Sequence, residues 1–362
     1  MPWTTPNRDI CGPNDCRNPT HAASNPRFQT RQKVRWDDEW LYIAAELEEP
    51  QVWANNTKHD CVVFADNDYE VFISADGSSH YYKEYEMSAG NANWDLCLNK
   101  AYLNGGYENS SRVFGAAGFD ELSRGLLSAT AVHGCSLNRP NADGSSCRGW
   151  TAEVRMPLAA VALNNSVSVP PKSGSYWRIN FSRVEWKVKT MGKYYEFVGA
   201  DTGCNWTWPE GCAQAGAGRA GAGCATNPGN NWVWAPTGVV DIHLPEYWGY
   251  LQFSDAAVNT TAVAHDPDWT IRSVAMQLYY AQLAYFSKHS KYTADLAALA
   301  PLAPKGPRAL EGNCTQPPRV TLLRGAQGYR GIVTARVADG EQDARSAVIL
   351  DDRHLSVVPV VG

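Results

Sequence analysis

The fourteen residues Phe64 to Gly77, FADNDYEVFISADG, combine side chains that could do chemistry. They include three aspartates, one glutamate and three aromatic rings. Two carboxyl groups about 5–10 Å apart could hydrolyse a glycosidic bond, and Glu70 with Glu185 is the candidate pair. A carboxylate on a sugar-binding strand can instead accept hydrogen bonds from sugar hydroxyl groups. We expect binding and no catalysis, because the sequence has no G-x-S-x-G or H-E-x-x-H motif.

The aspartates of the same stretch raise the question of a metal ion. Calcium takes hard oxygen ligands such as carboxylates, and the candidate ligands are Asp66, Asp68 and Asp76. Their spacing is not that of an EF-hand loop, and an ordinary acidic turn is the alternative. A structural calcium ion is therefore the candidate cofactor. No P-loop or dinucleotide-binding motif occurs, so no organic cofactor is expected.

Strand periodicity indicates where these side chains point. In DYEVFIS, Tyr69 and Val71 fall on one face of a strand and Glu70 falls on the other. In YWRINFSR, Arg178 and Asn180 alternate with large apolar residues in the same way. We expect Glu70, Arg178 and Asn180 on an open concave face, where hydrogen-bonding groups beside aromatic rings suit sugar recognition. A structural ion pair between Arg178 and Glu70 is the alternative.

Many short strand patterns separated by Gly, Pro, Asn and Ser predict a mainly β protein. We expect an antiparallel β-sandwich of the jelly-roll or immunoglobulin-like kind over residues 1–255. The character of the sequence then changes. Asp266 as N-cap and Pro267 at the first helical position introduce the helical pattern WTIRSVAMQLYYAQLAYFSKH. Residues 256–362 are therefore expected to form an α+β appendage, a long helix followed by a small β-meander.

Length and charge exclude several classes of protein. A chain of 362 residues is long enough for two domains. Its formal net charge is −5 and no basic stripe is present, so nucleic acid is not expected as a partner. No apolar run reaches about 18 residues, so no membrane span is expected. The first residues, MPWTTPNRDI, lack the charged and apolar regions of a signal peptide.

Cysteines and glycosylation sequons nevertheless indicate an extracellular protein. An even, dispersed set of cysteines suits disulfides in an oxidising compartment, although the sequence does not determine their pairing. The ten are Cys11, Cys16, Cys61, Cys97, Cys135, Cys147, Cys204, Cys212, Cys224 and Cys314. The N-x-[ST] sequons begin at Asn55, Asn109, Asn164, Asn205, Asn259 and Asn313. We therefore expect a secreted, disulfide-bonded glycoprotein.

Several segments resemble the carbohydrate-binding module family 9-like proteins of the DOMON-like sandwich group. They include VRWDDEWLYIAAELEEPQVWA, DCVVFADNDYEVFISADG and YYKEYEMSAGNANWDL. GWTAEVRMPLAAV, PKSGSYWRINFSRVEW and NNWVWAPTGVVDIHLPEYWGYLQFS follow in the family's order, so the resemblance covers roughly residues 30 to 255. LYYAQLAYFSKHSKYTADLAAL resembles the helical extension that often follows this module. The resemblance implies a calcium-containing β-sandwich that binds sugars, with a preference for the chain ends of glucans and xylans.

The resemblance also implies particular binding residues. Members of this family hold a sugar between two tryptophans, helped by a glutamate on a strand. Glu70 matches that glutamate, and Phe64 stands where the first tryptophan is expected. The second falls in NWVW, with Trp234 as the better match and Trp232 as the alternative, and Trp186 is a further stacking candidate. Phenylalanine keeps a stacking face but loses area and the indole N–H donor.

We therefore predict a secreted, glycosylated, non-catalytic protein that binds polysaccharide or another glycan. The alternative is a structural glycoprotein of the extracellular matrix, a cell wall or a filament, built on the same module. In that case the β-rich tail SAVILDDRHLSVVPVV could add to the sheet edge of a second copy and form a homo-oligomer or filament.

Overall fold

The chain forms two compact units. The computed structural model describes residues 8–9, 28–186, 188–197, 230–237, 241–257, 260–311, 315–336 and 345–359. Unit 1 comprises Met1–Ala75, Tyr81–Asn99 and Tyr107–Thr261. Unit 2 comprises Asp76–His80, Lys100–Gly106 and Ala262–Gly362. Each unit has its own hydrophobic core.

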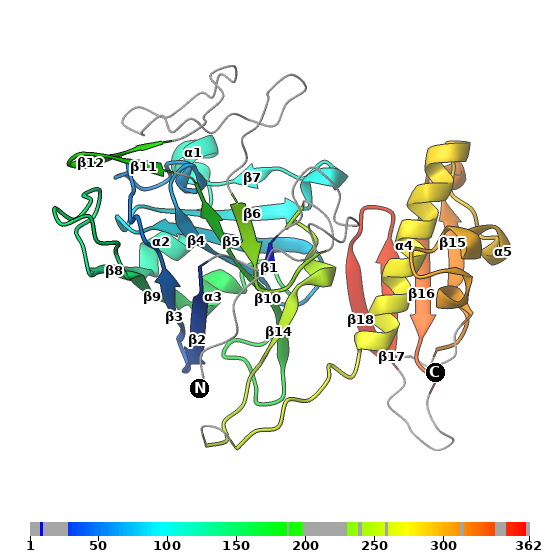
Figure 1. Cartoon of the computed structure of the whole chain (residues 1–362). Helices are drawn as coiled ribbons and strands as arrows, with labels where there is room; N and C mark the ends of the chain where they lie inside the picture. The colour runs from blue at the N-terminus through cyan, green and yellow to red at the C-terminus, as the bar shows by residue number, and fades with distance from the viewer. Residues whose placement is uncertain are drawn as a thin grey trace. The chain divides into compact units, whose positions relative to one another are not determined.

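Two antiparallel sheets build unit 1 (Figure 1). The strands of the larger sheet are β1 (Arg8–Asp9), β4 (Asp68–Ser74), β5 (His80–Ser88), β6 (Asn93–Lys100), β7 (Glu108–Asn109), β10 (Tyr176–Glu185), β13 (Asn230–Val233) and β14 (Gly249–Gln252). Their order is β1-β13-β10-β4-β5-β6-β7, with β14 also paired to β10. The smaller sheet consists of β2 (Thr30–Trp36), β3 (Trp40–Glu48), β9 (Gly149–Pro157) and β8 (Leu127–His133), in that order. The predicted mainly β, antiparallel sandwich is confirmed.

Short elements connect these strands. The ribbon strands are β11 (Val188–Met191) and β12 (Tyr194–Phe197), and the short helices are α1 (Ser111–Phe114), α2 (Glu121–Gly125) and α3 (Leu158–Val161). The 3-10 turns of the chain are η1 (Val63–Ala65), η2 (Tyr102–Asn104), η3 (Gly115–Ala117), η4 (Pro245–Tyr247), η5 (Ala300–Leu302), η6 (Pro307–Leu310) and η7 (Arg324–Ala326). Of these, η1 and α2 lie beside the polar clusters described below.

Strand alternation fills the core between the two sheets. Leu41 and Ile43 of β3 and Tyr69 and Val71 of β4 are almost completely buried in one cluster, together with Ile179 of β10. Successive side chains of a strand point to opposite faces, so the intervening residues lie on the outer faces. Each large apolar side chain that is buried in this way contributes about 1.5–3 kcal/mol to stability.

The N-terminal end of strand β10 contacts the smaller sheet through aromatic rings. Trp177 is 1% exposed, and its ring centroid lies 4.9 Å from that of Phe253 in an edge-to-face arrangement. The Phe253 ring in turn lies 5.3 Å from the ring of Trp36, the last residue of β2. Edge-to-face pairs of this kind add about 0.5–1.5 kcal/mol to the burial itself.

Strand β10 contacts the smaller sheet near its other end through a buried arginine. Arg183 Nη1 donates to Thr30 Oγ1 at 3.2 Å and to the carbonyl oxygen of Glu48 at 3.0 Å. Its Nη2 donates to Glu49 Oε2 at 3.2 Å and to Glu185 Oε2 at 2.7 Å. The guanidinium therefore joins the start of β2 and the end of β3 to β10, inside the protein.

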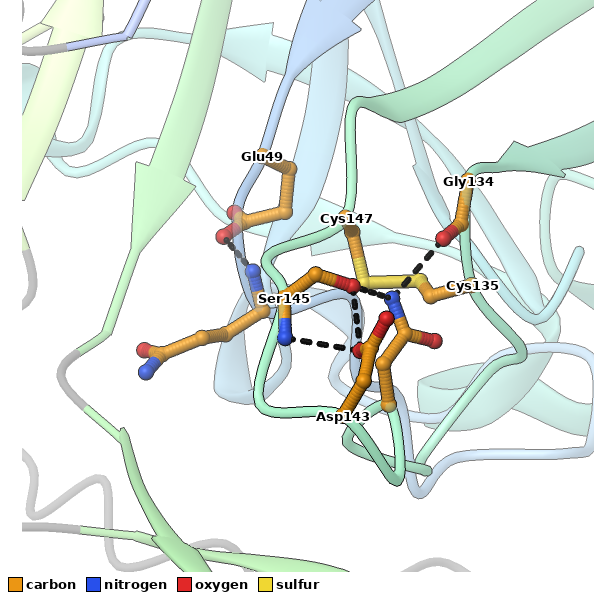
Figure 2. The surroundings of a disulfide bond; sticks show 8 residues. Glu49, Gly134, Cys135, Asp143, Ser145 and Cys147 are labelled. Atoms are coloured by element: carbon orange, nitrogen blue, oxygen red, sulfur yellow. Dashed lines mark hydrogen bonds between the residues drawn. A yellow bond between two sulfur atoms is a disulfide. The ribbon is translucent and has the colours of Figure 1, made fainter.

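A disulfide closes the loop between β8 and β9 (Figure 2). The Cα atoms of Cys135 and Cys147 lie 5.0 Å apart, and Cys61 is also disulfide-bonded. The expectation of a disulfide at Cys97 is wrong: its thiol is unpaired, because β6 directs the side chain into the core, where cysteine packs as a small apolar residue. The other predicted disulfide cysteines lie outside the described residues; they are Cys11, Cys16, Cys204, Cys212, Cys224 and Cys314.

Replacing both Cys135 and Cys147 by alanine is expected to lower the free energy of unfolding by about 2–3 kcal/mol. The bridge joins cysteines that are 12 positions apart, and closing a loop of this length restricts the unfolded chain by about 3 kcal/mol. Urea unfolding followed by tryptophan fluorescence measures the change. Ser145→Ala, in the same loop, is the control that leaves the bridge intact, and an equal loss in that variant would contradict the prediction.

Unit 2 is a four-stranded antiparallel sheet packed against one long helix. The helices are α4 (Trp269–His289) and α5 (Leu296–Leu299), and the sheet order is β15 (Arg319–Leu323), β16 (Gly328–Thr334), β17 (Arg345–Leu350) and β18 (Leu355–Pro359). Figure 1 shows α4 lying along β16 and β17. Ile271 and Leu278 of α4 are buried against Val333 and Ile349. The α+β appendage is confirmed, and its β-rich tail forms the β17–β18 hairpin of this sheet.

The helix begins slightly later than expected. Asp268, not Asp266, occupies the N-cap position before Trp269. Asp266 Oδ1 accepts the backbone N–H of Asp268 at 2.9 Å, so the predicted capping carboxylate orders the residues just before the helix. Within the described residues, no helix is long and apolar enough to cross a membrane.

Half of the sequons lie in the described residues. Asn55 and Asn164 are exposed. Asn109 is half-buried, and its Oδ1 accepts the backbone N–H of Phe119 at 3.0 Å. Asn205, Asn259 and Asn313 lie outside the described residues. Of the three sequons that the structure describes, Asn55 and Asn164 are therefore the more accessible to solvent.

Candidate functional site

Four acidic side chains meet on the outer face of the larger sheet. Asp68 and Glu70 project from β4, and Glu84 and Glu86 project from β5. Glu70 lies directly opposite Glu86 in the strand pairing, and none of the four is more than 6% exposed. Carboxylate oxygens of Asp68, Glu70 and Glu86 all lie within 4.8 Å of one another. We call these four residues the carboxylate cluster.

Burial determines the protonation of this cluster. It raises the pKa of Glu70 to about 7, although Ser182 donates a hydrogen bond that favours the charged form. Burial, together with the charge of Glu70, raises the pKa of Asp68, Glu84 and Glu86 well above the usual range. Like charges held this close and out of water cannot all ionise. At neutral pH the cluster therefore retains protons or is neutralised by a cation.

Three aromatic side chains border the carboxylate cluster. The backbone N–H of Phe64, in η1, donates to Glu86 Oε2 at 3.0 Å. Trp186 Nε1 donates to the carbonyl oxygen of Phe64 at 2.8 Å, and the ring of Trp94 lies 6.2 Å from that of Phe64. Phe64 and Trp186 are half-buried and Trp94 is buried. Predicted residues Phe64, Glu70 and Trp186 therefore come together here.

Sequence reasoning missed Trp94, Glu84 and Glu86. Trp94 alternates in NWDLCLN with Leu96 and Leu98, and all three share the outer face with Phe72. Glu84 and Glu86 alternate in the same way along β5. The signal was therefore present in each strand, but only the pairing of β4 with β5 shows that the acidic residues meet.

The two tryptophans expected to complete the sugar site lie on the other face of the sheet. Trp232 pairs with Arg183, whereas Val233 pairs with Ser182, the residue opposite Glu70. Directly opposed residues share a face, so Trp232 and its i+2 neighbour Trp234 point away from Glu70. Trp232 is 1% exposed. The Trp234 ring packs on the sandwich core, 5.8 Å from the ring of Phe181.

Arg178 and Asn180 lie on the same face of the sheet as Glu70, but their side chains bind other groups. Arg178 lies opposite Ser74, four positions along β10 from Ser182. Its Nη1 donates to the carbonyl oxygen of Trp248 at 2.8 Å, and its guanidinium lies 3.8 Å from the centre of the Tyr250 ring. Asn180 bonds both backbone groups of Ala235 at 2.9 Å. These side chains position the backbone, and the structure does not gather them with Glu70 on an open face.

The candidate calcium ligands are likewise not brought together as a set. Asp66 Oδ2 accepts the backbone N–H groups of Asn55 and Asn56, at 3.0 and 2.8 Å, so it orders the preceding loop. Asp68 is the first residue of β4, and Asp76 lies beyond its end. The strand has seven residues, each of which extends it by about 3.3 Å, so the two aspartates are at opposite ends of β4. Asp76 Oδ1 accepts the N–H of Ser78, as in an ordinary acidic turn. Only Asp68 belongs to a group of converging carboxylates, with Glu70 and Glu86.

The candidate hydrolase pair is separated by the sheet. Glu70 lies on the outer face, opposite Ser182, whereas Glu185 follows the alternation of Arg183 and points to the other face. Glu185 is 3% exposed and accepts a hydrogen bond from Arg183. This pair therefore cannot act on one glycosidic bond.

A half-buried histidine, His243, lies further along the outer face. The His243 ring is 6.0 Å from the ring of Phe72, and its Nδ1 is 3.0 Å from the hydroxyl oxygen of Tyr82. Burial lowers the pKa of His243 to about 4. The folded protein therefore keeps this imidazole neutral in a pH range where an unfolded chain would protonate it.

Acidification from pH 6.5 to pH 4 is expected to remove about 2 kcal/mol of stability through His243. The unfolded state binds a proton near pH 6.5 and the folded state only near pH 4, so this contribution is complete above pH 6.5 and is lost as the pH falls. The full shift would give about 3 kcal/mol, and partial exposure of the ring reduces it. Urea unfolding at several pH values compares the parent with His243→Gln, and identical pH slopes would contradict the prediction.

The outer face of the smaller sheet carries an open groove of about 650 Å³. Tyr42, 37% exposed, borders it, and the small side chains of Ala44 and Ala129 leave room at its centre. Glu153 and Arg155 supply polar groups along the same groove. It is a second surface where an aromatic ring and hydrogen-bonding groups lie together, on the opposite sheet from Glu70.

No protein-family model matches the chain, and no curated protein matches it. Similar solved structures include a Bacteroides uniformis protein whose carbohydrate binding is inferred, at 14% identity and a TM-score of 0.41, covering 70% of this chain and 87% of that one. Another is a carbohydrate-binding module of family 9 from Caldicellulosiruptor kristjanssonii in complex with cellotriose, at 10% identity and a TM-score of 0.36. The match covers 74% of this chain and 89% of that one. A family 9 module from the same organism in complex with glucose matches at 14% identity and a TM-score of 0.30. That match covers 51% of this chain and 67% of that one. At these similarities, no residue of this chain takes its role from those proteins.

Proposed function

We propose that unit 1 binds carbohydrate at the outer face of the larger sheet, beside the carboxylate cluster. The observation that carries this proposal is the placement of Phe64 and Trp186. Both rings are half-buried. The backbone N–H of Phe64 donates to Glu86 Oε2, and Trp186 Nε1 donates to the Phe64 carbonyl oxygen, so both residues lie beside the strand pair that carries Glu70 and Glu86. Sugars present apolar ring faces and many hydroxyl groups, so they suit aromatic rings beside hydrogen-bond acceptors. The family resemblance of the motif around Glu70 supports the same choice.

Calorimetric titration with soluble glucan and xylan oligosaccharides tests the proposal. Phe64→Ala and Trp186→Ala are each expected to weaken binding about tenfold, because stacking contributes about 0.5–1.5 kcal/mol per ring. Phe64→Trp is expected to strengthen it a few-fold, because indole adds stacking area. Tyr42→Ala, in the groove of the smaller sheet, is the matched control and is expected to bind like the parent.

Two results would count against this proposal. A parent protein that binds no oligosaccharide at millimolar concentration would overturn carbohydrate binding. Loss of binding in Tyr42→Ala, with Phe64→Ala unchanged, would move the site to the groove of the smaller sheet.

We also propose the carboxylate cluster as the place for the calcium that the resemblance implies. Asp68, Glu70 and Glu86 offer converging oxygen atoms, which are the ligands that calcium prefers. Asp68 Oδ2 is buried and has no hydrogen-bond partner among the residues that the structure describes. A bound calcium ion would neutralise the negative charge of the group. Weaker oligosaccharide binding after chelation, restored by calcium, would support this assignment, and unchanged binding would contradict it.

We propose that the protein is a secreted glycoprotein without catalytic activity. The Cys135–Cys147 disulfide, the disulfide-bonded Cys61 and the exposed sequons at Asn55 and Asn164 support secretion and glycosylation. Mass spectrometry of glycopeptides from the natively produced protein tests the setting, and unmodified Asn55 and Asn164 would contradict glycosylation there. Release of new reducing ends from glucan or xylan would contradict the absence of catalysis.

A further inference from the structure

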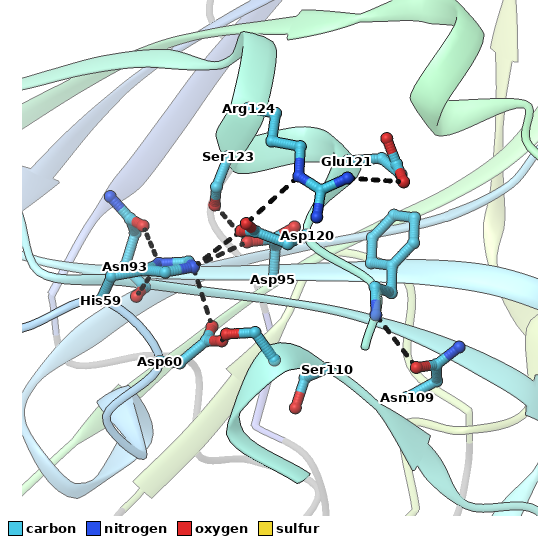
Figure 3. Close-up of polar contacts among 12 residues, drawn as sticks. His59, Asp60, Asn93, Asp95, Asn109, Ser110, Asp120, Glu121, Ser123 and Arg124 are labelled. Carbon is cyan, nitrogen blue, oxygen red and sulfur yellow. Dashed lines mark hydrogen bonds and ion pairs between the residues drawn. The ribbon is translucent and has the colours of Figure 1, made fainter. Parts of the chain in front are cut away.

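A second cluster of metal-ligating side chains lies on unit 1, away from the carboxylate cluster. His59 and Asp60 lie in the loop before η1, Asp95 lies in β6, and Asp120 is the N-cap residue of α2. Asp95 alternates with the outward-facing Trp94, so it points to the opposite face of the sheet from Glu70. Figure 3 shows the three aspartates converging on one nitrogen of His59.

The distances from His59 to the three aspartates are close to those between ligands of one metal ion. His59 Nε2 lies 3.0 Å from Asp120 Oδ1, 3.3 Å from Asp60 Oδ1 and 3.6 Å from Asp95 Oδ1. Ligand atoms that each lie 2.0–2.2 Å from a tetrahedral zinc ion are about 3.3–3.6 Å from one another. Ligand atoms of His59, Asp95 and Asp120 also lie within 4.8 Å of one another, and Asp60 adjoins this group through its contact with His59.

The imidazole is oriented as a metal ligand is. His59 Nδ1 lies 2.8 Å from Asn93 Oδ1 and 3.1 Å from the carbonyl oxygen of Asn93. A proton on Nδ1 donates to these oxygens and leaves the lone pair of Nε2 directed at the aspartates. Metal-ligating histidines are commonly held by such a bond from the other ring nitrogen. Ser111 and Ser123 similarly donate hydrogen bonds to Asp60 and Asp95.

One buried oxygen atom points independently to a missing ligand. Asp60 is 6% exposed and Asp95 is 0% exposed. Asp60 Oδ1 lies at ion-pair distance from His59 Nε2, whereas Asp95 Oδ2 has no hydrogen-bond partner among the residues that the structure describes. Leaving a buried carboxylate oxygen without a partner is unfavourable, so such an oxygen is rarely found without one. Arg124 also contacts the cluster, with its Nε 3.6 Å from Asp120 Oδ2 (Figure 3).

We propose that His59, Asp60, Asp95 and Asp120 bind a divalent transition-metal ion, for which zinc is the best fit. Histidine nitrogen and aspartate oxygen are both zinc ligands. Calcium and magnesium prefer all-oxygen sites, so the imidazole separates this site from the carboxylate cluster. His59 is exposed and borders an open cavity of about 460 Å³, which gives the ion a path from solvent. The ion would join the loop before η1 to β6 and to α2.

The test is zinc binding by the full chain after its metals have been removed with a chelator. Zinc is titrated in competition with a chromophoric chelator, and thermal unfolding is measured with and without one equivalent of zinc. We expect one equivalent bound and a midpoint raised by several degrees, because a ligand that binds the folded state stabilises it. His59→Gln and Asp95→Asn are each expected to weaken this binding at least about tenfold and to remove the thermal shift.

His133→Gln is the matched control. His133 is also an imidazole of unit 1, but its Nε2 lies 3.0 Å from Thr151 Oγ1 in the smaller sheet, outside the cluster. We expect this variant to bind zinc like the parent. His59 is at the surface, so failure of His59→Gln to fold is not expected, and circular dichroism verifies its structure.

Three results would overturn the proposal. Absence of zinc binding by the parent would leave a protonated His59 as the group that neutralises the aspartates. Zinc binding that survives in His59→Gln would belong to other side chains. Calcium binding at equal affinity, indifferent to His59→Gln, would show that the oxygen atoms alone form a site.

Discussion

Arg183→Met is expected to lower the free energy of unfolding by about 3–5 kcal/mol, because it leaves buried acidic groups without their cation. Arg183 is 1% exposed and holds Glu49 and Glu185, which are also buried. Burial and the charge of Glu49 already raise the pKa of Glu185 well above its usual range, while Arg183 opposes that shift. The substitution also removes the hydrogen bonds to Thr30 and Glu48 that join the two sheets.

Equilibrium urea unfolding measures this loss, and two further variants separate its causes. Arg31→Met is the matched control, since Arg31 and Glu46 form an exposed ion pair at 3.8 Å and such pairs contribute about 0–1 kcal/mol. Combining Arg183→Met with Glu49→Gln and Glu185→Gln is expected to recover part of the stability, because it removes the uncompensated acids. A loss below 1 kcal/mol in Arg183→Met would contradict the prediction.

Trp177→Ala is expected to lower the free energy of unfolding by a similar amount, about 3–5 kcal/mol. The Trp177 ring is fully buried and packs edge-to-face on Phe253, which also contacts Trp36 of the smaller sheet. Alanine would leave a cavity at this point, and β10 would lose its aromatic contact with β2. Thermal and urea unfolding measure the change, together with the near-ultraviolet circular dichroism that reports on packed rings.

Two further variants separate the effect of ring size at Trp177 from the effect of removing any tryptophan. Trp177→Phe keeps a ring and is expected to destabilise less than alanine. Trp269→Ala removes a tryptophan that is 47% exposed in unit 2, and its effect is expected to be small. If Trp177→Ala cost no more than Trp269→Ala, the aromatic contact between the sheets would contribute little to stability.

Much of the fold could be predicted because period-two patterns are local. DYEVFIS is β4 residue for residue, and alternation separates the residues that face the sandwich core from those on the outer face, although all seven are buried. The same reasoning predicted the long helix and the small sheet of unit 2. The grouping of Phe64, Glu70 and Trp186 could be predicted because two of them lie near one strand and the third directly follows β10.

The errors in the site have physical causes. Alternation tells which residues of one strand share a face, but the face that two strands have in common depends on their register. The family resemblance places Trp232 or Trp234 beside Glu70, and the pairing of β13 with β10 directs both to the other side. Glu185 is a different case, because alternation within β10 already separates it from Arg178 and Asn180. The cluster around His59 draws on three segments with no fixed spacing, so sequence alone gives no signal for it.

The position of β10 in the sheet has a consequence for folding during synthesis. Glu70 and Ser182 lie opposite each other although more than a hundred residues separate them in the chain. When β4 and β5 leave the ribosome, the partner on the other side of β4 has not yet been made, and long-range pairings of this kind form slowly. An unpaired edge of β4 is then open to association with other chains. Nascent chains that end before residue 185 should therefore depend on chaperones until β10 emerges.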